Sequence, residues 1–388
     1  MPVINRIAEF HDDVVAWRRD FHVHPELLYD LPRTSARVAE LLGSFGVDEV
    51  TTGIGRSGVV GIIRGRNPGS RTIGLRADMD ALPILERTGK PHASTTPGKM
   101  HACGHDGHTA MLLGAARYLA ETRNFEGTVA LIFQPAEEGG AGARAMLEDG
   151  MLERFGIDEV YGMHNMPGLA PGSFAIREGA IMASSDKFTI TIEGVGGHAA
   201  RPHLSTDPVI IAAHMVTALQ TIVSRNRNPL LPAVLSITAI HAGQTFNVTP
   251  REVTMLGTIR ALDESVRSFM QERLCEMVPL LATSFGGTAT VDYEIGYPVV
   301  VNHREGTDLA ARVAREIAGE RAVDAHTPPS MGGEDFAFML NQRPGAFIFL
   351  GNGSTGELHT DTYDFNDEII PVGSSFWVRL VETALPAQ

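Results

Sequence analysis

Short apolar runs alternate with segments of helical periodicity over most of this 388-residue chain, and this alternation strongly constrains its fold. Residues 59–63, 72–75, 128–133 and 159–163 are apolar runs of strand length. Residues 109–121 place apolar side chains at helical spacing between two of these runs. Strands that alternate with helices indicate an α/β fold with a mostly parallel sheet flanked by helices.

A different pattern over residues 184–296 predicts a second domain inserted into the first. Apolar and polar residues alternate there, as in a sheet with one solvated face. The predicted order is strand, helix, strand, strand, helix, strand, which is an α+β (βαββαβ) arrangement. The α/β pattern then resumes, with a short helix over 334–340 and a strand over 346–350. We therefore predict one α/β domain formed by residues 1–183 and 297–388, and an inserted domain formed by 184–296.

The charge and cysteine content exclude several classes of protein. There are 46 Asp and Glu residues against 32 Lys and Arg residues, a net charge of −14, which argues against nucleic acid and anionic membranes as partners. Two cysteines provide no disulfide framework. The first residues lack a secretory signal, and the apolar stretches fall short of the ~18 residues that a membrane span needs. We expect a soluble, cytoplasmic protein.

Acidic and histidine residues lie beyond the carboxyl ends of four of the predicted strands, His359 in the loop after the last of them. Ligands of open α/β sheets bind at the carboxyl ends of the strands, so we expect these side chains to meet at one edge. They are Asp78, Asp80, Glu137, Glu138, His164 and His359.

The densest cluster of possible metal ligands is HACGHDGH at 101–108. Cysteine, histidine and carboxylate are the ligand set of transition metals. Cys103 and His105 are separated by one glycine, which suits a tight loop that turns both toward one ion. A solvated histidine-rich loop with a buried cysteine is the alternative. His22 and His24 could support such a site or lie at the surface.

Glu137 and Glu138 follow a buried apolar strand and precede two glycines. In an extended chain, adjacent side chains point in opposite directions. One carboxylate could therefore bind a metal while the other faces a substrate. A solvated pair of acids on a loop is the alternative.

Taken together, these residues resemble the M20 metallopeptidase family, and most closely its amidohydrolase branch of hippurate hydrolases, N-acyl-amino-acid amidohydrolases and auxin-conjugate hydrolases. The resemblance covers essentially the whole chain. It is carried by HVHPEL at 22–27, RADMDALP at 76–83, HACGHDGHTAMLLGAA at 101–116, QPAEEGGAGA at 134–143, HNMPGLAPG at 164–172, GGHAARPH at 196–203, GQTFNVTP at 243–250, MGGEDFAFML at 331–340 and LHTDTYDFND at 358–367.

The resemblance implies two divalent metal ions per subunit. Zn²⁺ or Mn²⁺ is expected, and Co²⁺ or Ni²⁺ is compatible with the same ligands. Cys103 would be the bridging thiolate, and Asp78 stands where other branches have a metal-binding histidine, so its role is open. The implied ligands are Cys103, His105, Glu138, His164 and His359.

The resemblance also implies roles for three further residues and for the inserted domain. Glu137 would be the general base, and Asp80 would orient a ligand histidine or tune the site. Residues 184–296 would form a lid and dimerisation domain, from which His198 reaches the active site of a neighbouring subunit. A homodimer, or a dimer of dimers, is therefore expected.

The implied reaction is hydrolysis of the amide bond of N-acyl amino acids, such as hippurate-like or N-acetyl conjugates, by a metal-bound hydroxide. The product carboxylate needs hydrogen-bond donors, and Asn247, Arg260, Gly332 and Gly333 are candidates, the glycines as the N-terminus of a helix at 334–340. Asn247 could instead serve only its turn, and Arg260 could be solvated. A dipeptidase of the same family and a non-catalytic metal-binding protein are the rival interpretations.

Overall fold

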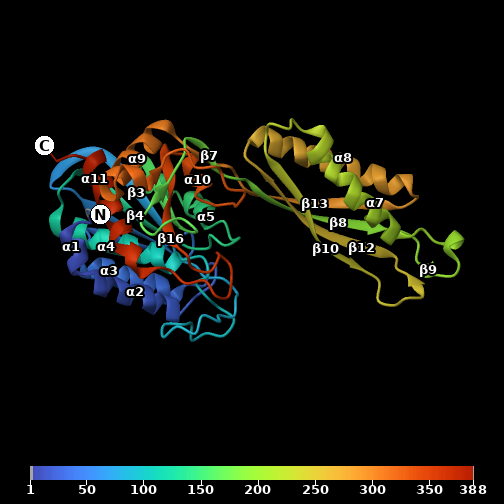
Figure 1. Cartoon of the computed structure of the whole chain (residues 1–388), viewed down its shortest axis with the longest axis horizontal. Helices are drawn as coiled ribbons and strands as arrows, with labels where there is room; N and C mark the ends of the chain where they lie inside the picture. Colours follow the sequence, from blue (N-terminus) through green and yellow to red (C-terminus); the bar gives the residue numbers. More distant parts are fainter. Residues whose placement is uncertain (1–2, 388) are drawn as a thin grey trace. The chain divides into compact units, whose positions relative to one another are not determined.

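The computed structural model describes residues 3–387 and divides into two compact units, shown in Figure 1. Unit 1 contains the chain up to Gly179, Val301–Pro328 and the chain from Asp335 onward. Unit 2 contains Ala180–Val300 and Pro329–Glu334. The short segment Pro329–Glu334 thus groups with unit 2, although the sequence analysis placed it in the first domain.

Unit 1 is an α/β unit built on one eight-stranded sheet with the order β1-β2-β4-β3-β5-β16-β6-β15. Its strands are β1 (Glu49–Ile54), β2 (Gly58–Arg64), β3 (Asn67–Asp78), β4 (Glu126–Gln134), β5 (Glu159–Pro167), β6 (Phe174–Ala175), β15 (Val323–Asp324) and β16 (Gly345–Gly353). Its helices are α1 (Asn5–Glu9), α2 (His11–Val23), α3 (Pro32–Ser44), α4 (His105–Thr122), α5 (Gly142–Glu148), α6 (Met151–Arg154), α9 (Arg304–Ala318), α10 (Ala337–Leu340) and α11 (Ile370–Ala384), with the short 3₁₀ turns η3 (Glu320–Ala322) and η4 (Asp367–Ile369).

The centre of this sheet is parallel and its flanks are mixed. Strands β4, β3, β5 and β16 run parallel to one another. Strand β2 pairs antiparallel with β4, and β6 pairs antiparallel with β16. The predicted α/β fold with a large helix-flanked sheet is therefore confirmed, and the antiparallel pairs lie outside the parallel centre.

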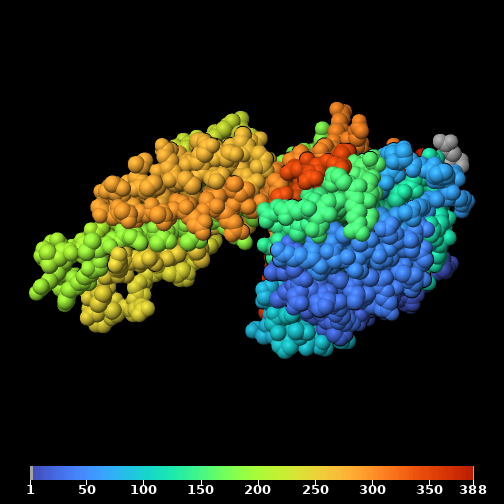
Figure 2. Space-filling view, turned by 180° about the vertical axis from the view of Figure 1, so that it is seen from behind, coloured from blue at the N-terminus to red at the C-terminus, as the bar shows by residue number. Residues whose placement is uncertain are grey.

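The apolar runs explain why these strands are central. Every residue of Val129–Phe133 in β4 is fully buried, as expected for a strand covered on both faces. Helix α4 contacts β3 and packs between α2 and α11, and most of its residues are buried. Figure 2 shows that the N-terminal segment, drawn in blue, forms much of the visible surface of unit 1.

The short helix expected over 334–340 begins later, at Ala337. The carboxylate of Asp335 accepts hydrogen bonds from Arg76 Nη2 at 3.1 Å, Gln134 Nε2 at 2.7 Å and the Ala143 backbone N–H at 2.9 Å. This carboxylate is committed to neighbouring elements and does not begin a helical turn. The part of the prediction that started the helix at Glu334 is wrong.

Unit 2 contains a four-stranded antiparallel sheet in the order β10-β12-β8-β13. Helices α7 and α8 pack on it, and the sequential order β8-α7-β10-β12-α8-β13 is the predicted βαββαβ arrangement. The elements are β8 (Ser185–Glu193), β9 (Gly197–His198), η1 (Pro202–Leu204), α7 (Pro208–Thr221), a π turn η2 (Ile222–Asn226), β10 (Ala233–Ala242), β11 (Val248–Thr249), β12 (Glu252–Ala261), α8 (Glu264–Ser284) and β13 (Thr288–Tyr297). Two further short strands, β7 (Gly179–Met182) and β14 (Val300–Asn302), lie where the chain passes between the units.

Both helices of unit 2 start at an aspartate. Asp207 accepts a hydrogen bond from the Val209 N–H, and Asp263 accepts from the N–H groups of Ser265 and Val266. Such capping satisfies backbone donors that a helix leaves unpaired.

One helical segment of the described chain, Pro208–Asn226, is long and apolar enough to cross a membrane by length and composition alone. In the structure its residues Ile211, Met215 and Leu219 are buried in the core of unit 2. One face of this helix packs on the sheet, and 33% of the 18-residue apolar window is buried.

Candidate metal centre

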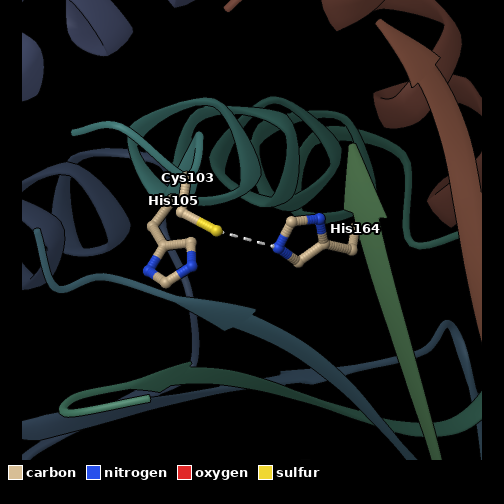
Figure 3. Close-up of side chains that lie close together, drawn as sticks. All are labelled: Cys103, His105 and His164. Carbon is tan, nitrogen blue, oxygen red and sulfur yellow. Dashed lines mark hydrogen bonds between the residues drawn. The ribbon is translucent and has the colours of Figure 1, made fainter. Parts of the chain in front are cut away.

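The carboxyl ends of three neighbouring strands bring the predicted residues of unit 1 together. Asp78 ends β3, Glu137 and Glu138 follow β4, and His164 lies in the last part of β5. Cys103 and His105 come from the loop and first turn at the start of α4, and Figure 3 shows that both lie beside His164. The edge of the sheet predicted from the sequence is thus where these side chains meet.

Hydrogen bonds to the backbone fix the orientation of both buried histidines. Nδ1 of His105 donates to the carbonyl oxygen of Asp80 at 2.8 Å, so Nε2 points into the cluster. Nδ1 of His164 donates to the carbonyl oxygen of Asn165 at 2.6 Å, and its Nε2 lies 3.4 Å from Sγ of Cys103. Histidine ligands of metals are commonly oriented in this way, by a partner on the other ring nitrogen.

The buried carboxylate of Asp80 holds the two glutamates in place. Its Oδ1 accepts the N–H of Glu137 at 2.9 Å, and its Oδ2 accepts the N–H of Glu138 at 3.1 Å. Burial outweighs these contacts and raises the pKa of Asp80. Asp80 therefore supports the cluster in two ways. Its backbone carbonyl oxygen accepts a hydrogen bond from His105, and its carboxylate accepts hydrogen bonds from the backbone of the glutamate pair.

His359 completes the group from the loop after β16. Its Nε2 lies 3.1 Å from Oε1 of Glu138, and its backbone N–H donates to the carbonyl oxygen of Ala102. The φ angle of His359 is 63°, a left-handed conformation that a residue with a Cβ adopts at a cost. Its side chain is 54% exposed, so this side of the cluster is open to solvent.

The electrostatics of the cluster favour a cation. Burial alone would raise the pKa of Asp78, but Arg76, His105 and His108 hold it well below its usual value. Burial would lower the pKa of His105, but Asp78, Asp80 and Glu138 raise it to about 10. Burial and the nearby Glu138 also raise the pKa of the Cys103 thiol. A bound cation would reverse this last effect, because it stabilises the thiolate.

The residues fit divalent metal ions. Within the described residues 3–387, Nε2 of His105 is buried without a hydrogen-bond partner, and the carboxylates of Asp78 and Glu138 lie 3.6 Å and 3.9 Å away. A thiol, imidazoles and carboxylates together are a transition-metal donor set. In each of the following groups the ligand atoms all lie within 4.8 Å of one another: Cys103, His105 and His164; Cys103, Glu138 and His359; His105, Glu137 and Glu138.

The remaining predicted residues lie in unit 2, in two places. His198 in β9 pairs with Val248 in β11, and the carbonyl oxygen of Asn247 accepts the N–H of Ala199, so His198 and Asn247 share one exposed ribbon. Burial lowers the pKa of Arg260, and a Cβ atom at Gly333 would lie 3.0 Å from its Nη1.

The argument that gave Gly332 and Gly333 an anion-binding role does not hold. It relied on the N-terminus of a helix at Glu334, but the helix begins at Ala337 and spans four residues. The N–H of Gly332 donates to Oγ of Ser330 within unit 2.

The sequence analysis did not predict the buried residues that support the ligand residues through hydrogen bonds. Asn165, His108 and Tyr363 are buried and hydrogen-bonded to one another or to ligand residues. His108 lies in the HACGHDGH run, and Asn165 directly follows His164, so proximity to ligands in the sequence was an available signal for these two. Tyr363 lies in the LHTDTYDFND stretch that carries the resemblance, but its residue type alone predicted no role.

A parallel-centred α/β sheet with a thiol, imidazoles and carboxylates at its carboxyl edge is the arrangement of a metal-binding α/β protein. The chain belongs to the peptidase family M20/M25/M40, whose sequence profile matches residues 74–383. It is 41% identical to a hippurate hydrolase of Campylobacter jejuni, over 98% of both chains. It is 39% identical to an N-acetylcysteine deacetylase of Bacillus subtilis, over 97% of this chain and 98% of the relative.

A solved structure extends the comparison to the fold. A dinuclear metal-binding peptidase of the M20 family from Bacillus subtilis matches with a TM-score of 0.84 and 35% identity, over 97% of this chain and 99% of that one. The predicted family is therefore confirmed. The protein is an amidohydrolase, and its cluster is suited to divalent metal ions.

Proposed function

We propose that the protein hydrolyses the amide bond of N-acyl amino acids and releases a carboxylic acid and a free amino acid. The observation that carries this proposal is the glutamate pair, which Asp80 holds beside the Cys103, His105 and His164 cluster. Relatives that cover nearly the whole chain are a hippurate hydrolase and an N-acetylcysteine deacetylase, which support this substrate class.

The metal ligands are proposed to be Cys103, His105, Glu138, His164 and His359, with two Zn²⁺ or Mn²⁺ ions, or Co²⁺ or Ni²⁺, bound among them. Ions bound there supply Lewis-acid activation of the substrate carbonyl and of a water molecule.

Glu137 is proposed to move the proton. Its buried carboxylate accepts a proton from the attacking water and passes it to the nitrogen of the scissile amide, so that the amine can leave. Its neighbour Glu138 lies close to His105 and His359, so it is assigned to metal binding.

Exchanging each glutamate for glutamine separates these two roles. Glu137→Gln should keep the metal content near that of the wild type and lose turnover, whereas Glu138→Gln should lose metal because a ligand charge is gone. Metal analysis of both purified variants is the measurement. Equal metal loss in both would remove the distinction between base and ligand.

His198 is proposed to donate a hydrogen bond to the oxyanion of the reaction. Its Nδ1 accepts the N–H of Ala200 at 3.1 Å, so the neutral ring carries its proton on Nε2. An exposed histidine in this tautomer is a donor, and such a donor contributes about 3–4 kcal/mol to catalysis. Asn247 and Arg260 are proposed to meet the substrate carboxylate.

The protein is proposed to be a homodimer in which unit 2 forms the dimer contact and His198 serves the partner's site. Mixing His198→Ala with Glu137→Ala under conditions of subunit exchange tests this. Mixed dimers then hold one intact site, and random pairing should restore about a quarter of wild-type activity. Mixing His241→Ala, an exposed histidine on β10, with Glu137→Ala is the control for histidine loss as such. No recovery despite demonstrated exchange would place His198 in its own subunit's site.

An assay of N-acyl amino acids with varied acyl groups, with each metal restored, tests the substrate class. Free dipeptides run in parallel separate this proposal from a dipeptidase. Turnover of dipeptides alone would refute it, and metal binding without any amide hydrolysis would favour a non-catalytic metal-binding protein. A cytoplasmic location is proposed because the thiol of Cys103 must stay reduced, and cell fractionation would test it.

A further inference from the structure

Asn165 touches two of the proposed metal ligands at once. Its side-chain Nδ2 donates to the backbone carbonyl oxygen of Cys103 at 2.6 Å, and its backbone carbonyl oxygen accepts a hydrogen bond from Nδ1 of His164 at 2.6 Å. Asn165 is fully buried. One residue thus connects the irregular loop that carries Cys103 to the end of β5.

His108 holds Asn165 from the side of α4. The backbone N–H of Asn165 donates to Nε2 of His108 at 2.9 Å, so that nitrogen is an acceptor and Nδ1 carries the proton. Nδ1 then donates to Oδ1 of Asp78 at 2.6 Å, while Oδ2 of Asp78 accepts from Nη1 of Arg76 at 2.7 Å. The chain of contacts from Arg76 to Asn165 therefore has a defined donor and acceptor at each link.

Tyr363 sets the rotation of the Asn165 amide. Its hydroxyl donates to Oδ1 of Asn165 at 2.8 Å, which leaves Nδ2 facing the carbonyl oxygen of Cys103. The amide cannot turn over without placing its NH₂ group against the Tyr363 hydroxyl and its oxygen against a carbonyl.

Gly104 makes this approach possible. Its φ angle is 89°, and a Cβ atom at this position would lie 2.3 Å from Nδ2 of Asn165 and 2.4 Å from the Tyr363 hydroxyl. Glycine therefore serves two purposes here, since it adopts the left-handed conformation freely and leaves room for both side chains.

We propose that Asn165 is a positioning residue that fixes the thiol of Cys103 relative to the imidazole of His164, with His108 and Tyr363 setting its orientation. The inference rests on the proposed function, because it assumes that these ligands hold metal. Partners that orient ligands commonly contribute about 10–100-fold to metal affinity. The same contacts give Asp78 a role, because its carboxylate orients His108.

The test compares Asn165→Ala with Asn302→Ala. Asn302 is also buried in unit 1 and makes three hydrogen bonds, to the backbone of Arg177 and Phe347, away from the cluster. Both variants lose a buried amide, so both should lose stability. Only Asn165→Ala should bind Zn²⁺ about 10–100-fold more weakly than the wild type, as measured by competition with a chelator.

Co²⁺ gives a second measurement that stability alone would not change. A bond between Co²⁺ and a thiolate produces a charge-transfer absorption, which reports the geometry at Cys103. We expect this band to weaken or shift in Asn165→Ala and to stay unchanged in Asn302→Ala. Wild-type Zn²⁺ affinity together with a wild-type Co²⁺ band in Asn165→Ala would overturn the proposal and leave the proposed function intact.

Two further outcomes are decisive. If Asn165→Ala does not fold, the Zn²⁺ affinity of Tyr363→Phe is measured in its place, because this change removes only the hydroxyl that orients the Asn165 side-chain amide. It should weaken Zn²⁺ binding about threefold to tenfold, the loss expected for one buried hydrogen bond, and unchanged affinity would overturn the proposal. A folded wild-type protein that binds neither Zn²⁺ nor Co²⁺ would overturn both the inference and the proposed function.

Discussion

Replacing Asp80 by asparagine tests how the glutamate pair is held. The carboxylate accepts two backbone N–H groups with two different oxygens, at 2.9 Å and 3.1 Å. Asparagine has one acceptor oxygen, so one of the two N–H groups would face the amide NH₂ group. The backbone carbonyl oxygen of residue 80 would still accept Nδ1 of His105.

The magnitude follows from these contacts. Losing a charge-assisted hydrogen bond costs about 1.5–3 kcal/mol. Burial raises the pKa of Asp80, which shows that its charged form is costly to bury. Replacing it with a neutral amide recovers part of that cost. A net loss of about 2 kcal/mol is expected, and if it appears as misplacement of Glu137 it lowers kcat about thirtyfold.

The assay measures kcat, metal content and unfolding of Asp80→Asn beside Asp263→Asn. Asp263 is a carboxylate that also accepts two backbone N–H groups, at the start of α8 in unit 2. Asparagine is a good helix cap, so Asp263→Asn should cost less than about 1 kcal/mol and leave kcat unchanged. Asp80→Asn should keep most of its metal, because no ligand is removed.

Two results would refute this reasoning. Wild-type kcat in Asp80→Asn would show that the carboxylate does not position Glu137. An equal loss of kcat in Asp263→Asn would mean that the loss reflects general destabilisation.

The remaining predictions concern metal, charge and pH. A chelator should abolish activity while far-ultraviolet circular dichroism changes little, because a core of this size does not need metal to fold. Cys103→Ser should sharply weaken metal binding, and full occupancy in that variant would contradict a bridging thiolate. Arg267→Met leaves the buried carboxylate of Asp186 without its bidentate partner, so that only Tyr293 and Gly296 still donate to it. This change should destabilise unit 2 by about 3–5 kcal/mol, as measured by denaturant unfolding. His22 is buried, and although burial lowers its pKa, Asp106 and Glu86 raise it to about 9. The raised pKa of His22 therefore adds about 3 kcal/mol to the free energy of unfolding below about pH 6.5, and this contribution is lost as the pH rises through 9. The free energy of unfolding should fall less over this range in His22→Gln than in the wild type.

The sequence predicted the parts of the structure that depend on local pattern. Continuous apolar runs such as 128–133 mark strands that are covered on both faces, and β4 is such a strand. Ligand candidates at strand ends could be predicted to converge, because parallel strands end at the same edge of a sheet. The aspartate at 263 could be identified as a cap because its chemistry is local.

The parts that failed depend on contacts between distant residues. Asn165 meets Cys103, His108 and Tyr363, and a single sequence does not show that these positions are close in space. The helix expected from Glu334 starts late because Asp335 bonds to Arg76 and Gln134, more than 200 residues earlier in the chain.

Unit 1 is formed by separate segments of the chain, and this affects the order in which the newly made chain can fold. Strand β16 lies between β5 and β6 in the sheet, yet it is synthesised after the whole of Ala180–Val300. While the ribosome is still adding those residues, β5 and β6 have no strand between them, and α4 lacks its partner α11. Unpaired strand edges and uncovered apolar helices are the surfaces that aggregate and that chaperones bind. Unit 2, whose main sheet lies in one continuous stretch of chain, can close its core first, and unit 1 becomes complete only when Ile370–Ala384 has left the ribosome.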